Sequence, residues 1–153
     1  MKEFWNKRYE EEAFVYGENP NTYFADKIHA VPASKILFPC EGEGRNAVYA
    51  AQLGFETHAF DLSASAKKKA DALAQKHEVK LNYVVSEVEK IDYPTENFDA
   101  LVLIFAHFLP EKTKEYHCPF RYPCLKYIRI CKDYAETKQG SHPKREGSGE
   151  RPR

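Results

Sequence analysis

A short loop with two glycines carries the residues whose types and spacing have the clearest chemical meaning. Residues 40–47 read CEGEGRNA and follow an apolar run at 35–39. Glycine lets backbone approach a ligand that a side chain would block, and the first turn of a helix has unpaired N–H groups that donate to ligand oxygens. Gly-x-Gly is also common in ordinary turns. The loop is therefore either a ligand site or an ordinary turn, and the neighbouring strands and acidic residues decide between the two.

Two acidic residues stand where neighbouring strands of the same sheet are expected to end. Asp61 follows the apolar run 57–60, where nucleotide-binding α/β domains place an acid that accepts ribose hydroxyls. Glu87 follows a third apolar run, 81–85. Ligands of open α/β sheets bind at the carboxyl ends of the strands, so these acids and the loop are expected to face one adenosine-bearing ligand. Each acid also has a purely structural interpretation: Asp61 could cap a helix, and Glu87 could be a solvated residue of a loop.

An NAD-type dinucleotide is one of the adenosine-bearing ligands that fit this pattern. Gly42-x-Gly44-x-x-Ala47 matches the dinucleotide fingerprint with alanine in third place, so an NAD-dependent oxidoreductase is one alternative. Residues 1–34 precede the first strand and are rich in aromatic residues, whereas a dinucleotide domain commonly begins close to its first strand. Such a segment can fold over a cofactor or build an acceptor pocket, and it can equally cover the edge of the sheet.

The elements that must position these residues follow from the alternation of apolar runs with helical patterns. This alternation predicts an α/β fold of the Rossmann-like, doubly wound kind, with a mostly parallel sheet, helices on both faces and strand order 3-2-1-4. The predicted strands are 35–39, 57–60, 81–85 and 98–105. The predicted helices are 21–30, 45–53 and a third from Ser63 or Ser65 to about His77.

Composition limits the classes of partner. The chain has 153 residues, 42% of them apolar, with 23 basic and 23 acidic side chains, which is typical of one globular domain. Zero net charge removes the general electrostatic argument for binding nucleic acid or a membrane surface. Residues 1–12 are too charged for a signal peptide, and four cysteines are too few for a disulfide scaffold. We therefore expect a cytoplasmic protein, a monomer or weak homo-oligomer, with no nucleic-acid or membrane partner.

The C-terminal part of the chain differs from the rest. Residues 1–117 hold 14 basic and 19 acidic side chains, and residues 118–153 hold 9 and 4. These counts divide the chain into a domain at 1–117, with an N-terminal lid at 1–34 and a core at 35–117, and an atypical basic tail at 118–153. Disorder is expected from about residue 139 because the ending is almost entirely polar.

The final strands of the sheet are expected to be missing or altered. Prolines and cysteines interrupt the helical pattern that begins near Leu109, although residues 125–131 have some strand character. Without a fifth strand the fourth would have an uncovered edge. A zinc site is the rival interpretation of this region, but the spacings do not match paired Cys-x-x-Cys knuckles, so no metal is predicted. The zinc candidates are His117, Cys118, Cys124, Cys131 and His142.

Five motifs in this order resemble class I S-adenosylmethionine-dependent methyltransferases, most of all the small bacterial enzymes of the tellurite-resistance and thiopurine types. The motifs are FWNKRY at 4–9, Tyr-Gly with Pro-Asn at 16–21, EGEGRNA at 41–47, FDLS at 60–63 and NFD at 97–99. The resemblance covers residues 4 to about 117. It implies S-adenosylmethionine as cofactor and a small-molecule methyl acceptor. Phe38 and Cys40 stand where the family has an acid and a first glycine, and Glu41 is the candidate replacement for that acid.

The resemblance also implies roles for individual residues. The glycines would pass under the methionine part of the cofactor, the acid after the second strand would hold the ribose, and the residues after the third strand would flank the adenine. The implied cofactor residues are Glu41, Gly42, Gly44, Asn46, Asp61, Leu62, Glu87, Val88 and Phe105, and the implied lid residues are Trp5, Tyr9 and Tyr16.

Methyl transfer itself asks little of side chains, because the sulfonium methyl is already activated and needs mainly an aligned acceptor and exclusion of water. A general base is required only for an acceptor that is protonated at working pH. His107, after the fourth strand, is the candidate base, with a packing or loop role as the alternative. A chain lacking its final strands could also be a non-catalytic remnant that only binds the cofactor.

Overall fold

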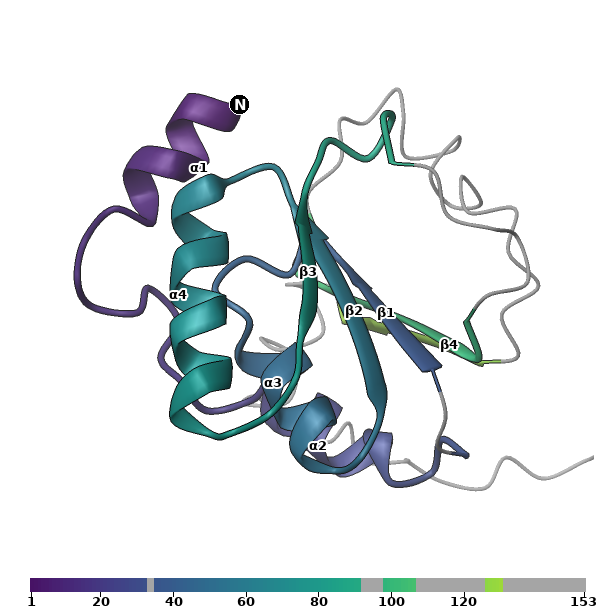
Figure 1. The fold of residues 1–153 in the computed structure, drawn as a ribbon. Helices are drawn as coiled ribbons and strands as arrows, with labels where there is room; N and C mark the ends of the chain where they lie inside the picture. The colour runs from purple at the N-terminus through teal and green to yellow at the C-terminus, as the bar shows by residue number, and fades with distance from the viewer. Residues whose placement is uncertain (33–34, 92–97, 107–125, 131–153) are drawn as a thin grey trace, which may run out of the picture.

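The computed structural model describes residues 1–32, 35–91 and 98–106, and the backbone of residues 126–130 (Figure 1). Its centre is a parallel sheet in the order β3-β2-β1-β4-β5. The predicted Rossmann-like sheet and its strand order 3-2-1-4 are confirmed. The strands are β1 (Lys35–Pro39), β2 (Glu56–Asp61), β3 (Asn82–Val85), β4 (Ala100–Ile104) and β5 (Lys126–Ile130).

A fifth strand covers the edge that was expected to be open. β5 pairs in parallel with β4 along its whole length, from Ala100 opposite Lys126 to Ile104 opposite Ile130. The expectation of an uncovered edge on the fourth strand is therefore wrong. The alternating apolar residues at 125–131 were the signal for this strand. The predicted disorder from residue 139 and the zinc candidates lie outside the described residues.

Four helices are described: α1 (Lys2–Arg8), α2 (Thr22–Ile28), α3 (Arg45–Gln52) and α4 (Ala64–Lys76). Asn21 caps α2 by accepting from Phe24 N, and Ser63, rather than Ser65, caps α4 by accepting from Ala66 N. In Figure 1, α2, α3 and α4 lie on one face of the sheet, and α1 packs on α4. None of the helices among the described residues has the length and apolar character needed to span a bilayer.

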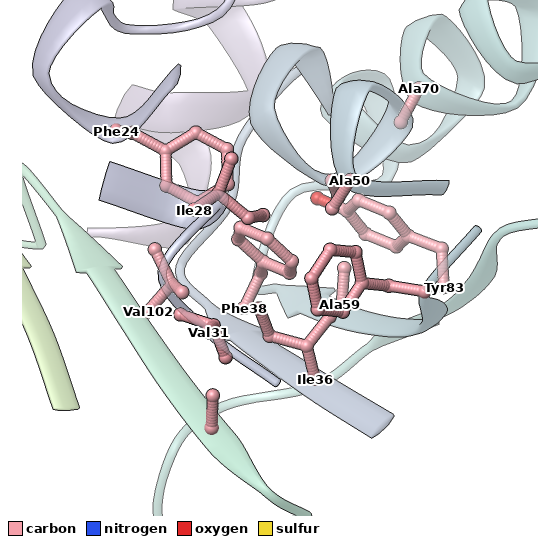
Figure 2. Packing of buried hydrophobic residues seen from close by; sticks show 13 residues of the cluster. Phe24, Ile28, Val31, Ile36, Phe38, Ala50, Ala59, Ala70, Tyr83 and Val102 are labelled. Atoms are coloured by element: carbon pink, nitrogen blue, oxygen red, sulfur yellow. The ribbon is translucent and has the colours of Figure 1, made fainter. Parts of the chain in front are cut away.

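The larger of the two main apolar clusters lies between the sheet and α2, α3 and α4 (Figure 2). Phe24 of α2 packs edge-on against Phe38 of β1, with ring centroids 5.5 Å apart. Small residues, Ala50 of α3 and Ala70 of α4, let these helices lie close to the strands. On the opposite face, a second cluster is built on Leu37 and Phe60. The central strands are thus buried on both sides, as expected for a parallel sheet.

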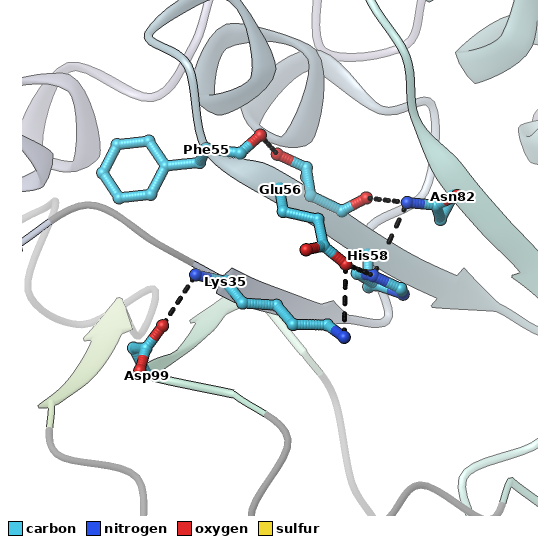
Figure 3. A network of polar contacts seen from close by, with 7 residues as sticks. Lys35, Phe55, Glu56, His58, Asn82 and Asp99 are labelled. Carbon is cyan, nitrogen blue, oxygen red and sulfur yellow. Dashed lines mark hydrogen bonds and ion pairs between the residues drawn. The ribbon is translucent and has the colours of Figure 1, made fainter.

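A polar network ties together the amino ends of the strands, at the edge opposite the glycine loop (Figure 3). Lys35 Nζ and His58 Nε2 both contact Glu56 Oε1, at 3.2 and 2.9 Å, and these hydrogen bonds lower the pKa of Glu56. Asp99 Oδ2 accepts from Lys35 N at 2.7 Å. The network links the start of β1 to the starts of β2 and β4. It lies at the amino edge of the sheet, and the glycine loop lies at the opposite, carboxyl edge.

Candidate functional site

The glycine loop turns sharply at Gly42, which has φ of +65°. Gly42 N donates to Asp61 Oδ2 at 3.1 Å, and Gly42 O accepts from Tyr83 Oη at 2.6 Å. A Cβ added to Gly42 would lie 2.9 Å from the hydroxyl of Tyr9, which covers the loop. Both the positive φ and this close approach require glycine, so the loop is held from β2 and β3 and covered by the N-terminal segment.

Gly44 serves helix packing. It has φ of +86°, and an added Cβ would lie 2.6 Å from the Cβ of Ala70 in α4. Glycine at this position therefore lets α3 begin directly against α4. Gly44 contributes no lining to the cleft described below, in contrast to the role that the resemblance implies for it.

Asp61 is buried at the end of β2 and binds two backbone amides. Its Oδ2 accepts from Gly42 N and its Oδ1 from Ser63 N, at 3.1 and 2.9 Å. Desolvation raises the pKa of Asp61, although hydrogen bonds from Ser63, Gly42 and Leu62 oppose that shift. A carboxylate oxygen can accept more than one hydrogen bond, so each oxygen retains capacity for a ligand hydroxyl. The side chain of Asp61 therefore stabilises the glycine loop and also lines the cleft described below.

The carboxylate of Glu41 occupies the N-terminus of α3. Glu41 Oε1 accepts from Asn46 N and Ala47 N, each at 2.9 Å. These are amides of the first helical turn that have no partner within the helix. Desolvation raises the pKa of Glu41 to about 7, against the two backbone hydrogen bonds and the positive charge of Arg45. Near neutral pH, this part of the cleft therefore contains a carboxyl group that is partly protonated.

Glu41 should make stability depend on pH. Its folded pKa of about 7 lies above the ordinary value of 4.5, so its contribution is fully present below pH 4.5 and is lost as the pH rises through 7. Glu41→Gln keeps an oxygen for Asn46 N and cannot ionise. Relative to wild type, we expect the variant to gain about 2 kcal/mol between pH 5 and pH 8, measured by urea unfolding. An equal difference at both pH values would contradict this assignment.

A cleft opens at the carboxyl edge of β1, β2 and β4, and most of the predicted site residues meet there. The predicted residues that line it are Trp5, Tyr9, Tyr16, Glu41, Asn46, Asp61, Leu62 and Phe105, and the further lining residues are Met1, Cys40, Arg45, Ile104 and Ala106. Cys40 and Arg45 belong to the loop at 40–47, Ile104 lies within the predicted fourth strand, and Ala106 follows that strand. Met1 had no local signal, because only the docking of α1 brings it to the cleft.

Four of the predicted residues are not among those that line the cleft: Gly42, Gly44, Glu87 and Val88. Glu87 pairs with Lys90 at 3.0 Å, and Val88 packs against the cluster of Leu37 and Phe60. His107 lies outside the described residues, one position after Ala106. Within residues 1–32, 35–91 and 98–106, no three His, Cys, Asp or Glu side chains are grouped to hold a metal ion.

The N-terminal segment is bound to the cleft by polar side chains of the glycine loop. Glu43 is buried, and its Oε2 accepts from Val15 N at 2.9 Å. Arg45 Nη1 donates to Tyr16 O at 2.7 Å, and the guanidinium lies 5.7 Å from the Tyr16 ring centroid. Asn46 Oδ1 accepts from Asn21 N at 2.8 Å. Three polar positions of the motif thus hold the preceding segment.

The N-terminus of α4 is also occupied, by Asn6 of α1. Asn6 Oδ1 accepts from Ser63 Oγ at 2.7 Å and from Ala64 N at 3.0 Å. The amides that begin both helices at the carboxyl edge of the sheet, α3 and α4, are therefore bound by the protein's own oxygen atoms. An anionic group of a ligand would have to displace one of these oxygens.

Comparison with known proteins assigns the chain to a family and shows which structures share its fold. Residues 36–118, more than half of the chain, match the family model described as "Methyltransferase domain". No match to a curated protein reached significance. The fold is similar to that of the PH0226 protein from Pyrococcus horikoshii OT3, with a TM-score of 0.62 and 20% identity over 78% of this chain and 59% of that chain.

Two further solved structures share the fold. A structure from a study of the conversion of a disulfide bond into a thioacetal group in echinomycin biosynthesis has a TM-score of 0.61 and 20% identity, over 68% of this chain and 48% of that one. A SAM-dependent methyltransferase from Thiobacillus denitrificans, in complex with S-adenosyl-L-homocysteine, has a TM-score of 0.51 and 15% identity, over 64% and 42%. The chain thus spans less than two thirds of the length of each.

Proposed function

We propose that this chain, which belongs to the methyltransferase domain family, binds S-adenosylmethionine and transfers its methyl group to a small-molecule acceptor. Within class I enzymes, the order of motifs favours the tellurite-resistance and thiopurine type. The proposal assigns cofactor binding to the carboxyl edge of β1 and β2 and acceptor binding to the aromatic side of the same cleft.

One observation carries the choice of cofactor: the Glu41 carboxylate on the N-terminus of α3. In dinucleotide-binding domains this helix end receives the pyrophosphate. A pyrophosphate here would compete with Glu41 for the amides of Asn46 and Ala47, and near neutral pH it would meet a partly ionised carboxyl group. S-adenosylmethionine has no phosphate and carries positive charge on its sulfur and amino groups. The NAD-dependent alternative is therefore disfavoured on electrostatic and steric grounds.

The side chains of the cleft suit the parts of this cofactor. Asp61 can accept ribose hydroxyls, and Leu62 next to it offers an apolar contact for the adenine. Glu41 supplies negative charge for the methionine ammonium, in place of the acid that the family has at the position of Phe38. The rings of Trp5, Tyr9 and Tyr16 can contact a sulfonium through their faces.

The chemistry needs an activated methyl group, which the cofactor supplies when bound. The chain's own task is to orient the acceptor and exclude water, and the aromatic residues at the cleft are suited to both. His107 follows Ala106, which lines the cleft, and remains our candidate base for acceptors that must lose a proton. Glu87 and Val88 remain candidate contacts of the adenine ring.

Calorimetric titration of the full chain tests the cofactor assignment. We expect S-adenosylhomocysteine to bind with micromolar affinity and NAD to give no heat of binding, because only NAD brings a pyrophosphate to the end of α3 occupied by Glu41. Tight binding of NAD, or no binding of S-adenosylhomocysteine, would overturn the assignment. Binding without transfer of a labelled methyl group to any of a panel of thiols, amines and phenols would favour the cofactor-binding remnant.

A further inference from the structure

Helix α1 lies at the cleft but contributes nothing to the buried core. No residue of Lys2–Arg8 is buried, and Phe4 is 63% exposed. Trp5 nevertheless lines the cleft and stacks on Tyr9, the C-cap of the helix, with ring centroids 5.6 Å apart and planes 20° apart. The segment therefore presents two aromatic rings to the site and is held there by the buried ring of Tyr9, whereas no residue of the helix itself is buried.

The side chain of Asn6 attaches α1 to α4 by hydrogen bonds, and the Arg8 guanidinium lies 5.8 Å from the Tyr16 ring centroid. The Oδ1 atom of Asn6 accepts from Ser63 Oγ at 2.7 Å, from Ala64 N at 3.0 Å, and lies 3.5 Å from Ser65 N. This oxygen sits at the positive end of a helix of 13 residues, where an acceptor is favoured. Asn6 lies between Trp5 and Tyr9 in the sequence, so its attachment fixes the place of both rings.

The chain that follows α1 is attached far more firmly. Glu43 accepts from Lys69 Nζ at 2.8 Å as well as from Val15 N, and Lys69 also donates to Ala13 O at 2.7 Å. The side chain of Glu43 is 3% exposed, so this ion pair is almost fully buried. Arg45 and Asn46 add their bonds to residues 16 and 21. Residues 10–12, between Tyr9 and this anchored segment, are exposed and can serve as the hinge.

Entry of a cofactor requires this part of the molecule to move. The cleft has a cavity volume of about 80 Å³, whereas small-molecule sites commonly have roughly 300–1,000 Å³. Tyr9 lies directly over Gly42, and Trp5 stacks on Tyr9. Displacing α1 together with Tyr9 would remove both rings from the cleft. Among residues 1–9, Tyr9 is the one that is buried, with 6% of its surface exposed, so the exposure of this ring is the main cost of opening.

We propose that Asn6 is a latch, a positioning residue that holds Trp5 and Tyr9 over the cleft, and that its release from Ser63 and Ala64 lets α1 swing about residues 10–12 to admit and discharge the cofactor. This inference rests on the proposed function. It predicts that closure of α1 and retention of the cofactor are coupled, because a ligand that contacts the closed rings favours the latched state. The hydrogen bonds of Asn6 then set how long the cofactor stays.

Trp5 is the only tryptophan of the chain, so its fluorescence reports directly on α1. We expect stopped-flow mixing of the full chain with S-adenosylhomocysteine to show faster association and dissociation in Asn6→Ala than in wild type. Dissociation should accelerate by about tenfold and association by less, because loss of the latch removes about one net hydrogen-bond contribution from the closed state. Lys2→Ala, an exposed change on the same helix, should leave both rates within twofold.

A double-mutant cycle with Ser63→Ala separates the latch from a general loosening of α4. Ser63 also caps α4, so its own substitution has an effect. Removal of Asn6 should add less in the Ser63→Ala background than in wild type, because only the bond from Ala64 N is then left to lose. Wild-type rates in Asn6→Ala, or fully additive effects in the cycle, would overturn the latch. Independently of any ligand, trypsin should cleave Asn6→Ala after Lys7 and Arg8 several times faster than wild type, at a temperature well below the Tm of both proteins. If wild type fails to bind S-adenosylhomocysteine in calorimetry, the proposed function fails, and the trypsin comparison still decides on the latch.

Discussion

Asp61→Ala is expected to reduce the affinity for S-adenosylhomocysteine by at least about 100-fold. The substitution removes the proposed acceptor of the ribose hydroxyls and leaves Gly42 N and Ser63 N without their partner, so the loop loses its attachment to β2. Hydrogen bonds to a charged group contribute about 1.5–3 kcal/mol each, and two such losses exceed a 100-fold change in affinity. Isothermal titration calorimetry at pH 7.5 measures the effect.

The matched control for this prediction is Asp71→Ala. Asp71 is an exposed acid on α4 that pairs with Lys67 within the same helix, so its removal changes the net charge equally and leaves the loop intact. We expect its affinity to stay within twofold of wild type. If Asp61→Ala binds like Asp71→Ala, Asp61 has no part in the cofactor site.

Gly44→Ala should cause the largest loss of stability among single-methyl additions to the loop. The new Cβ would lie 2.6 Å from Ala70 Cβ, at a φ of +86° that an L-residue adopts only with strain. Strain in the left-handed region costs about 1–2 kcal/mol and overpacking about 1–3 kcal/mol. We expect a loss of about 3 kcal/mol, equivalent to a Tm lower by about 10 °C, measured by calorimetry.

Gly54→Ala separates the cost of backbone strain at a positive φ from the cost of the steric contact with Ala70. Gly54 has a similar φ of +92°, but an added Cβ there would have no atom within 4 Å. It should cost only about 1–2 kcal/mol, the strain alone. Equal destabilisation by the two substitutions would show that α3 and α4 are not in close contact at Gly44.

Most of the sheet could be predicted from local pattern. Buried parallel strands are short and almost entirely apolar, so β1 and β4 stood out, and their order followed from the alternation with helices. Helix α1 had no such signal, because none of its residues is buried and the segment therefore shows no apolar periodicity. β5 was harder to assign because pairing with β4, not its own composition, defines it.

The sequence predicted those residues of the cleft that lie at the carboxyl ends of strands. Glu41 lies two residues after the end of β1 and Asp61 is the last residue of β2, and parallel topology brings those ends together. The partners of these residues were not predictable. The contact of Asn6 with Ser63 spans 57 residues of sequence, and the contact of Gly44 with Ala70 depends on the angle between two helices. Such contacts are set by packing, which no short motif encodes.

Because no residue of α1 is buried, changes in this helix can affect the lining of the cleft without affecting the stability of the fold. Substitutions in the domain interior alter stability, whereas the exposed positions of residues 2–8, apart from Asn6, can be exchanged with little effect on folding because they contribute nothing to that interior. The same helix lines the cleft through Trp5. If the cleft binds a ligand as we propose, changes in this one exterior helix can alter which molecules it accepts while the glycine loop and Asp61 stay as they are.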